Sequence, residues 1–278
     1  MTSDRPNRMD KVIDGFGDEW RHFDQGALSG EERRQIFDDY FAIFPWDSLP
    51  EHAVGADVGC GSGRWAQVAA PRVARLHCVE PSAAIEVARK NLAMAANVEF
   101  HAADVENIPL AGGSLDFAYC LGVLHHIPDT EAGLRLICDK LKPGAPFLVY
   151  LYYAFDNRPW FYRAIWRMSD IVRRVLCRLP FGLRLAASQL IAFGVYWPLA
   201  RAAAVLEKVG RRPESWPLGY YRDKSLYTMR TDALDRFGTR LEHRFTRAQI
   251  EKMLQRAGYV EIRFSDKAPF WCAVAHKR

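Results

Sequence analysis

The sequence predicts an α/β fold in which helices alternate with the strands of a doubly wound, mostly parallel sheet. The first observation is in residues 53–66, where a short apolar run is followed by three alternating glycines and then by helix formers. That order is typical of a buried strand, a tight turn and a helix N-terminus. The second observation is the strand–helix alternation that continues through residues 53–153. Sheets of this class bind their ligands at the carboxyl ends of the strands.

The N-terminal segment is predicted to be a frayed tail over residues 1–15, followed by a helix. Phe16, Trp20 and Phe23 would share one face of that helix, which either packs on the core or covers the ligand site as a lid. A second helix is expected to begin near Ser29, with acidic residues in its first turn, and to end before Pro45.

The glycine turn indicates what kind of ligand it can accept. Gly59, Gly61 and Gly63 would let the backbone approach a ligand closely. A dinucleotide-binding turn has the pattern G-x-G-x-x-G, but the sixth position here is Arg64, so that match fails. Asp57 lies just before the first glycine, where a carboxylate suits a cationic amino group better than a pyrophosphate.

The next two strands also end at acidic residues. A strand over residues 75–80 ends in Glu80, which lies 21 positions after Gly59 and could accept two hydrogen bonds from a ribose diol. Pro81 opens the following helix. A third strand over residues 97–101 is followed by Asp104.

The remaining elements complete the alternation. A fourth strand over residues 115–120 leads to a loop with two histidines, and a helix capped by Asp129 follows. A fifth strand covers residues 146–153, after which the alternation stops until a helix capped by Thr246. The last two strands are expected at residues 259–264 and 270–275.

Together, Asp57–Gly63, Glu80 and Asp104 resemble the spaced motifs of the class I S-adenosylmethionine (SAM)-dependent methyltransferases. The resemblance covers residues 53–150 well and residues 241–278 by topology. It implies a Rossmann-like, seven-stranded sheet with an antiparallel last strand, with SAM as cofactor and S-adenosylhomocysteine (SAH) as product. Asp104 would bind the adenine amino group, and the start of the loop after the fourth strand would line the methionine part. The implied cofactor-binding residues are Asp57, Gly59, Cys60, Gly61, Gly63, Glu80, Pro81, Asp104, Val105, Leu121 and Gly122.

Four segments are expected from this reading. They are an N-terminal helical lid (1–50), a SAM-binding core (51–153), a helical cap inserted after the fifth strand (154–240) and the C-terminal part of the core (241–278).

The catalytic demand of methyl transfer is modest, since the donor is already activated. The protein must align the nucleophile, exclude water and remove a proton from a hydroxyl acceptor. His125 and His126 are the candidate general bases; alternatively, both only shape the loop. The candidate substrate contacts are Trp20, Tyr152, Tyr153 and Arg158. No metal ligand cluster is apparent in the sequence.

The loop after the fourth strand lacks a motif that bears on the class of methyl acceptor. Enzymes that methylate exocyclic amines of nucleic acids resemble one another in an Asn/Asp-Pro-Pro-aromatic loop there, whereas this chain has Gly122-Val123-Leu124-His125. We therefore expect a small-molecule acceptor in secondary metabolism or another biosynthetic pathway, and no nucleic acid. An oxygen nucleophile is favoured, with carbon and nitrogen as alternatives. The chain is expected to be a monomer or homodimer.

The insertion allows three interpretations. Arginines and apolar residues alternate along predicted helices between residues 158 and 184, with Asp170 as the single acid. The helices could pack on the core, cap an anionic or lipid-like substrate, or make a transient contact with an anionic membrane surface. In the last case the protein could also be a non-enzymatic SAM-binding module.

Composition supports a globular protein. The 278 residues are 49% hydrophobic and carry a net charge of +5. The six cysteines are scattered without a C-x-x-C pair, so we expect reduced, buried thiols and a cytoplasmic location. We expect no signal peptide and no membrane span, because the longest uncharged run, Leu185–Ala200, is short and contains Pro198.

Overall fold

The computed structural model describes residues 9–211 and 216–278, which form two compact units. The first unit contains the described residues up to Gln25, together with Arg33–Ala154 and Leu241–Arg278. The second contains Gly26–Glu32 and the described residues of Phe155–Arg240. Each unit is described by itself below.

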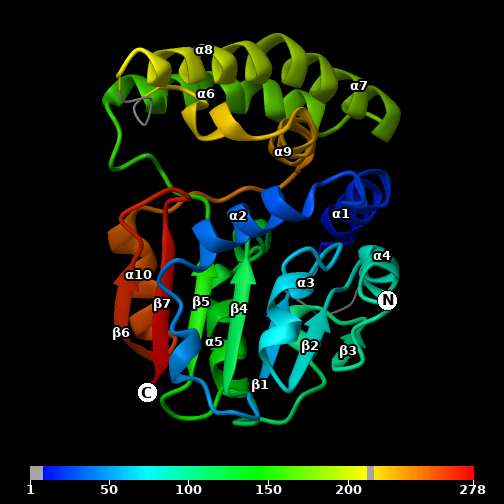
Figure 1. Cartoon of the computed structure of the whole chain (residues 1–278), viewed down its shortest axis with the longest axis vertical. Helices are drawn as coiled ribbons and strands as arrows, with labels where there is room; N and C mark the ends of the chain where they lie inside the picture. Colours follow the sequence, from blue (N-terminus) through cyan, green and yellow to red (C-terminus); the bar gives the residue numbers. More distant parts are fainter. Residues whose placement is uncertain (1–8, 212–215) are drawn as a thin grey trace. The chain divides into compact units, whose positions relative to one another are not determined.

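The first unit is built on a seven-stranded sheet with the strand order β3-β2-β1-β4-β5-β7-β6, which can be followed across Figure 1. All neighbouring pairs are parallel except those of β7, which runs antiparallel to both β5 and β6. The predicted Rossmann-like class, with its antiparallel last strand, is therefore confirmed. The strands are β1 (Val54–Val58), β2 (Arg75–Val79), β3 (Val98–His101), β4 (Phe117–Leu121), β5 (Pro146–Tyr150), β6 (Tyr259–Phe264) and β7 (Cys272–Lys277).

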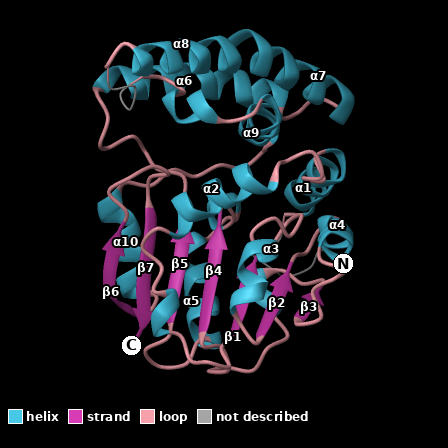
Figure 2. Ribbon diagram, viewed as in Figure 1, coloured by secondary structure: helices cyan, strands magenta, loops and turns pink. Residues whose placement is uncertain are grey.

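Helices cover this sheet because alternate strand residues point to opposite faces. In β5, Phe147 and Val149 enter an apolar cluster with helix α5, whereas Leu148 enters another with α2. The α-helices of this unit are α1 (Asp10–His22), α2 (Gly30–Phe41, from Arg33 on), α3 (Ala66–Ala69), α4 (Ala84–Asn91), α5 (Thr130–Lys140) and α10 (Arg247–Arg256); Figure 2 shows them with the strands. Short 3₁₀ turns lie at Trp46–Ser48, Ala70–Arg72, Val105–Asn107 and Leu124–His126.

Two predicted helix caps are confirmed. The Asp129 carboxylate accepts a hydrogen bond from the Ala132 N–H at 2.9 Å. Thr246 forms a reciprocal capping box with Gln249 at the start of α10. These caps fix where α5 and α10 begin.

The prediction of a frayed tail through residue 15 is wrong for its described part. Helix α1 already begins at Asp10, so Phe16 and Trp20 lie in its second half. The polar composition of the first residues hid this start. Packing decides it, since α1 contacts α4 and buries Val12 and Gly17. Residues 1–8 lie outside the described residues.

The second unit is helical. It contains α6 (Trp160–Leu176), α7 (Phe181–Ile191), a π-helical turn (Ala192–Tyr196), α8 (Trp197–Lys208), a 3₁₀ turn (Gly219–Asp223) and α9 (Leu226–Gly238). Helix α9 is the inner element, because it contacts α6, α7 and the π turn and buries Met229, Ala233 and Phe237. A small apolar cluster forms where these three side chains meet Ala192, Tyr196 and Ala200.

The longest helical run of this unit differs from expectation. Helix α7, the π turn and α8 continue without interruption over Phe181–Lys208, a stretch of 28 residues that is long and apolar enough to cross a membrane by length and composition alone. Pro198 was expected to limit this run, but it lies in the first turn of α8, directly after the π turn. A π turn changes the hydrogen-bond pattern just before the proline, whose missing N–H would otherwise interrupt a regular helix.

All six cysteines are buried and form no disulfide, as expected for reduced thiols.

Candidate functional site

The glycine turn connects β1 to α3 and is anchored to the end of β2. Gly59, Gly61 and Gly63 all have positive φ angles, of 78°, 53° and 76°. The Gly59 and Cys60 N–H groups donate to the Val79 carbonyl at 2.7 and 3.1 Å. A Cβ atom on Gly59 would lie 2.4 Å from a Val123 methyl group, so only glycine fits there.

Glu80 holds the other side of this turn. Its Oε2 accepts a hydrogen bond from the Gly61 N–H at 3.1 Å, and its Oε1 accepts one from the Ser82 N–H at 3.0 Å. Burial raises the pKa of this carboxyl, while the hydrogen bonds from Ser82 and Gly61 lower it. Its carboxylate therefore shapes the turn in addition to the predicted contact with a ribose diol.

Asp57 is the most unusual acid of the site. The side chain is 1% exposed, and Oδ2 has no hydrogen-bond partner among the described residues. Burial raises its pKa to about 8, with the Tyr119 hydroxyl opposing the rise and the charge of Glu80 adding to it. A buried carboxyl group with one oxygen lacking a hydrogen-bond partner suits a cationic ligand group. The predicted contact of Asp57 with the amino group of SAM stays a prediction.

The raised pKa gives a testable pH dependence. Between about pH 4 and pH 8 the folded protein keeps the Asp57 proton that the unfolded chain releases. The free energy of unfolding of the unliganded protein should therefore fall as pH rises through this window, by at most about 1.4 kcal/mol per pH unit from this group. Urea unfolding at several pH values measures the slope. Asp57→Asn should flatten it; an equal slope in the variant would contradict the assignment.

The other predicted cofactor residues also lie at strand ends. Asp104 follows β3, is partly exposed, and its Oδ1 accepts a hydrogen bond from the Asn107 amide at 2.5 Å. Val105 and Leu121 are buried, and Pro81 is half-buried at the turn into α4. Gly122 follows β4 with a φ of 79°, and a Cβ atom added there would meet no described atom within 4 Å. The space beside Gly122 is thus open, as a methionine-binding loop requires.

Helix α1 links the glycine turn to the histidine loop. The Trp20 indole lies over Gly61, where a Cβ atom would come within 3.0 Å of its ring nitrogen. The Phe16 ring lies 5.0 Å from the His126 ring, centroid to centroid. The Arg64 guanidinium lies over the Trp20 ring, 5.2 Å from its centroid. This helix therefore joins the loops that follow β1 and β4, at the sheet edge where a ligand would bind.

The two histidines have different hydrogen bonds, and these distinguish their roles. His126 Nδ1 lies 2.7 Å from the Leu241 carbonyl, which can only accept, so Nδ1 must carry the proton. The lone pair of the neutral ring is therefore on Nε2. A general base uses this tautomer, with one nitrogen oriented by a donor bond. The His126 side chain is itself 3% exposed, and its Nε2 is buried in the structure.

His125 has the opposite arrangement. Its Nδ1 accepts a hydrogen bond from the Tyr152 N–H at 3.4 Å, which leaves the proton on Nε2. The side chain is fully buried and stacks on the Tyr152 ring at 3.8 Å. Burial lowers the pKa of His125 well below its ordinary value. His125 thus fits a structural role better than that of a base.

Residues 241–245 position this loop, and sequence reasoning missed them. The Leu241 carbonyl binds His126, and the His243 N–H donates to the His125 carbonyl at 2.9 Å. The Arg244 guanidinium donates to the Tyr153 carbonyl and lies 5.1 Å from the Tyr152 ring. No motif marks this segment in the sequence; its place just before α10 was the available signal.

The predicted substrate residues are spread more widely. Tyr152 belongs to the histidine loop cluster through its stack with His125. Tyr153 pairs with Phe245 in an isolated bridge, and its ring lies 5.8 Å from Phe270. Arg158 lies in the second unit, where it contacts the Tyr162 ring.

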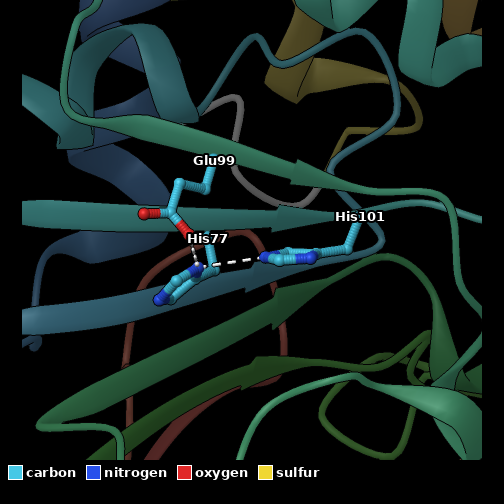
Figure 3. Close-up of side chains that lie close together, drawn as sticks. All are labelled: His77, Glu99 and His101. Atoms are coloured by element: carbon cyan, nitrogen blue, oxygen red, sulfur yellow. Dashed lines mark hydrogen bonds and ion pairs between the residues drawn. The ribbon is translucent and has the colours of Figure 1, made fainter.

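One cluster could in principle hold a metal ion. His77 on β2 and Glu99 and His101 on β3 bring three ligand atoms within 4.8 Å of one another, as Figure 3 shows. His77 Nδ1 lies 3.0 Å from His101 Nε2 and 3.4 Å from a Glu99 oxygen. However, the other Glu99 oxygen pairs with Arg75 at 3.2 Å, so a cation would have to compete with a guanidinium. We therefore interpret these three side chains as polar contacts between the neighbouring strands β2 and β3.

Comparison with known proteins adds family evidence to this geometry. Residues 56–149 match the family model described as a methyltransferase domain. An O-methyltransferase from Pyrenophora dematioidea is 36% identical over 98 residues, which cover 32% of this chain and 35% of that protein. A tRNA U34 carboxymethyltransferase from Desulfotalea psychrophila is 27% identical over 169 residues, covering 50% and 51%.

A solved structure extends the likeness of the fold. The SAM-dependent methyltransferase SibL, in its apo form, superposes with a TM-score of 0.51 at 17% identity, over 88% of this chain and 55% of that one. The chain spans about half the length, or less, of the curated relatives that it matches.

Proposed function

Since residues 56–149 are a class I SAM-dependent methyltransferase domain, we propose that the whole protein transfers a methyl group from SAM to an oxygen atom of a small molecule. SAM, when bound, supplies a methyl group that its sulfonium already activates for displacement. The proposal concerns the class of methyl acceptor and the residues of this chain that act on the acceptor.

The observation that carries the oxygen acceptor is the His126–Leu241 hydrogen bond of 2.7 Å. A hydroxyl acceptor must lose a proton as it attacks, and a neutral imidazole with its lone pair on Nε2 can take that proton. His126 lies in the 3₁₀ turn after β4, next to the Phe16 ring, so α1 helps exclude water there. Asp57 holds the cofactor's amino group, and Glu80 holds the turn and the ribose.

The names of the relatives indicate two classes of acceptor. The Pyrenophora protein is named an O-methyltransferase, and the Desulfotalea protein is named for a tRNA nucleotide. The β4 loop continues as Gly122-Val123-Leu124-His125 and lacks the nucleic-acid amine motif, which argues against methylation of a base at its exocyclic amine. We propose a small-molecule acceptor on this basis and on the histidine pair. A tRNA acceptor is the second outcome that the experiment must separate.

The test is an assay of SAH formation with the full chain and SAM. A panel of phenols, aliphatic alcohols, carboxylic acids, amines and unmodified tRNA is offered, and mass spectrometry locates the methyl group. We expect methylation of one hydroxyl class. Methylation of tRNA alone would overturn the small-molecule proposal, and methylation of amines or carbon alone would overturn the oxygen assignment.

A further inference from the structure

The second unit exposes an apolar surface of unusual extent. Among the described residues, the exposed large apolar side chains all lie between Trp160 and Trp216, with the exception of Met94. On α6 they recur every three or four positions and so form one stripe along the helix. Its members are Phe161, Ile165, Met168, Val172 and Val175. Soluble proteins rarely expose a continuous patch of this kind without a partner.

Two charged residues of α6 point inward. Asp170 and Arg173 are the buried residues of this helix, and they pair at 2.7 Å. Arg173 also donates to the Thr239 carbonyl at 2.8 Å, just after α9. Helix α6 therefore buries one charged pair while it exposes an apolar stripe, which is unusual for a surface helix.

The run from α7 to α8 likewise combines buried polar side chains with exposed apolar ones. Its first helix buries Arg184 and Ser188, and Arg184 donates to the Gly238 carbonyl at 3.3 Å. Leu183, Leu190 and Phe193 are exposed, as is Trp197 at the start of α8. Only 22% of the most apolar window of Phe181–Lys208 is buried inside the structure. Apolar side chains on the outside of a helical unit are expected where its surroundings are apolar.

The charged residues around these apolar stripes are almost all positive. Residues 157–206 contain eight arginines and a single acid, Asp170, which is buried against Arg173 and Arg174. The exposed arginines of α6 follow the helical repeat and form a row beside the apolar stripe. They are Arg163, Arg167 and Arg174, and the exposed Arg178 follows just after the helix end. Apolar stripes bordered by arginines match the acyl boundary and headgroups of an anionic bilayer.

We propose that the exposed faces of α6 and of the α7–α8 run form a membrane-docking surface for bilayers that carry anionic lipids. The arginine row binds headgroups while the apolar stripes enter the acyl boundary. A second copy of the chain is a poorer occupant, because a two-fold contact through this face would bring the arginine rows of both copies together. The proposal is independent of the methyl acceptor, so its failure would leave the proposed function untouched.

The test is co-sedimentation of the full chain with phosphatidylcholine vesicles, with and without about 30 mol % phosphatidylserine. We expect binding to the anionic vesicles that is on the order of tenfold tighter than to the neutral ones, and that weakens as salt rises from roughly 0.05 to 0.5 M. Absence of binding to either vesicle would overturn the proposal.

Two sets of variants sharpen the result. Replacing Ile165, Met168 and Val172 together by glutamate should lower the vesicle partition at least about tenfold, whereas Met94→Glu, at the exposed apolar residue of the other unit, should leave it unchanged. Arg163→Gln with Arg167→Gln should reduce the preference for phosphatidylserine. Because all these side chains are exposed, circular dichroism should show unchanged folding. Equal loss in Met94→Glu, or a dimer by light scattering that the triple variant breaks, would refute membrane docking.

Discussion

Replacing His126 by alanine should lower kcat for a hydroxyl acceptor by about 10²–10⁴-fold and leave SAH affinity nearly unchanged. The reason is the tautomer imposed by the Leu241 carbonyl, which puts the ring's lone pair on Nε2. Without the imidazole, the acceptor must lose its proton to water. Initial rates at saturating SAM measure the effect, and calorimetry with SAH measures the affinity.

Two further variants separate base catalysis from positioning. His126→Gln can still donate to the Leu241 carbonyl but cannot act as a base, so it should be as slow as His126→Ala. His125→Phe keeps the stack on Tyr152 and should retain most of the turnover. Full turnover in both His126 variants at neutral pH would mean that the enzyme acts by alignment alone.

Replacing Glu80 by alanine should weaken SAH binding by on the order of 2–4 kcal/mol, roughly 30- to 1,000-fold in Kd. The change removes the predicted acceptor for the ribose diol. It also leaves the Gly61 and Ser82 N–H groups without their carboxylate partner, so the glycine turn loses an anchor. Isothermal titration calorimetry gives the affinity directly.

The matched control is Glu86→Ala. Glu86 is an exposed acid on α4 that forms an ion pair with Arg89 on the same helix. The variant should bind SAH as the unchanged protein does. Thermal unfolding of unliganded Glu80→Ala separates a loosened turn from a lost ligand contact. An unchanged Kd in Glu80→Ala would place Glu80 outside the cofactor site.

Local sequence patterns were sufficient for the core of the fold. The β1–turn–helix segment could be predicted because small apolar residues, alternating glycines and helix formers have strong local preferences. The order of strands and helices, and the acids at the strand ends, follow from the same short-range periodicity. Asp57 and Glu80 lie where the pattern put them, close to the glycine turn.

Only the tertiary structure shows that the two histidines have different hydrogen-bond partners. His125 and His126 are adjacent in the sequence, yet the partner that sets the His126 tautomer is a carbonyl 115 positions away. The start of α1 at Asp10 and the placement of Trp20 over Gly61 likewise depend on packing between distant segments.

The direction in which α6 turns its apolar face is another property that the tertiary structure decided. The sequence by itself determined that arginines and apolar residues alternate with a helical period between residues 158 and 184. Periodicity distinguishes the two sides of a helix but is identical for a helix that hides its apolar side and one that exposes it. Only the folded unit decided the choice, because the Asp170–Arg173 pair and its bond to the Thr239 carbonyl bury that side of the helix and leave the apolar stripe exposed.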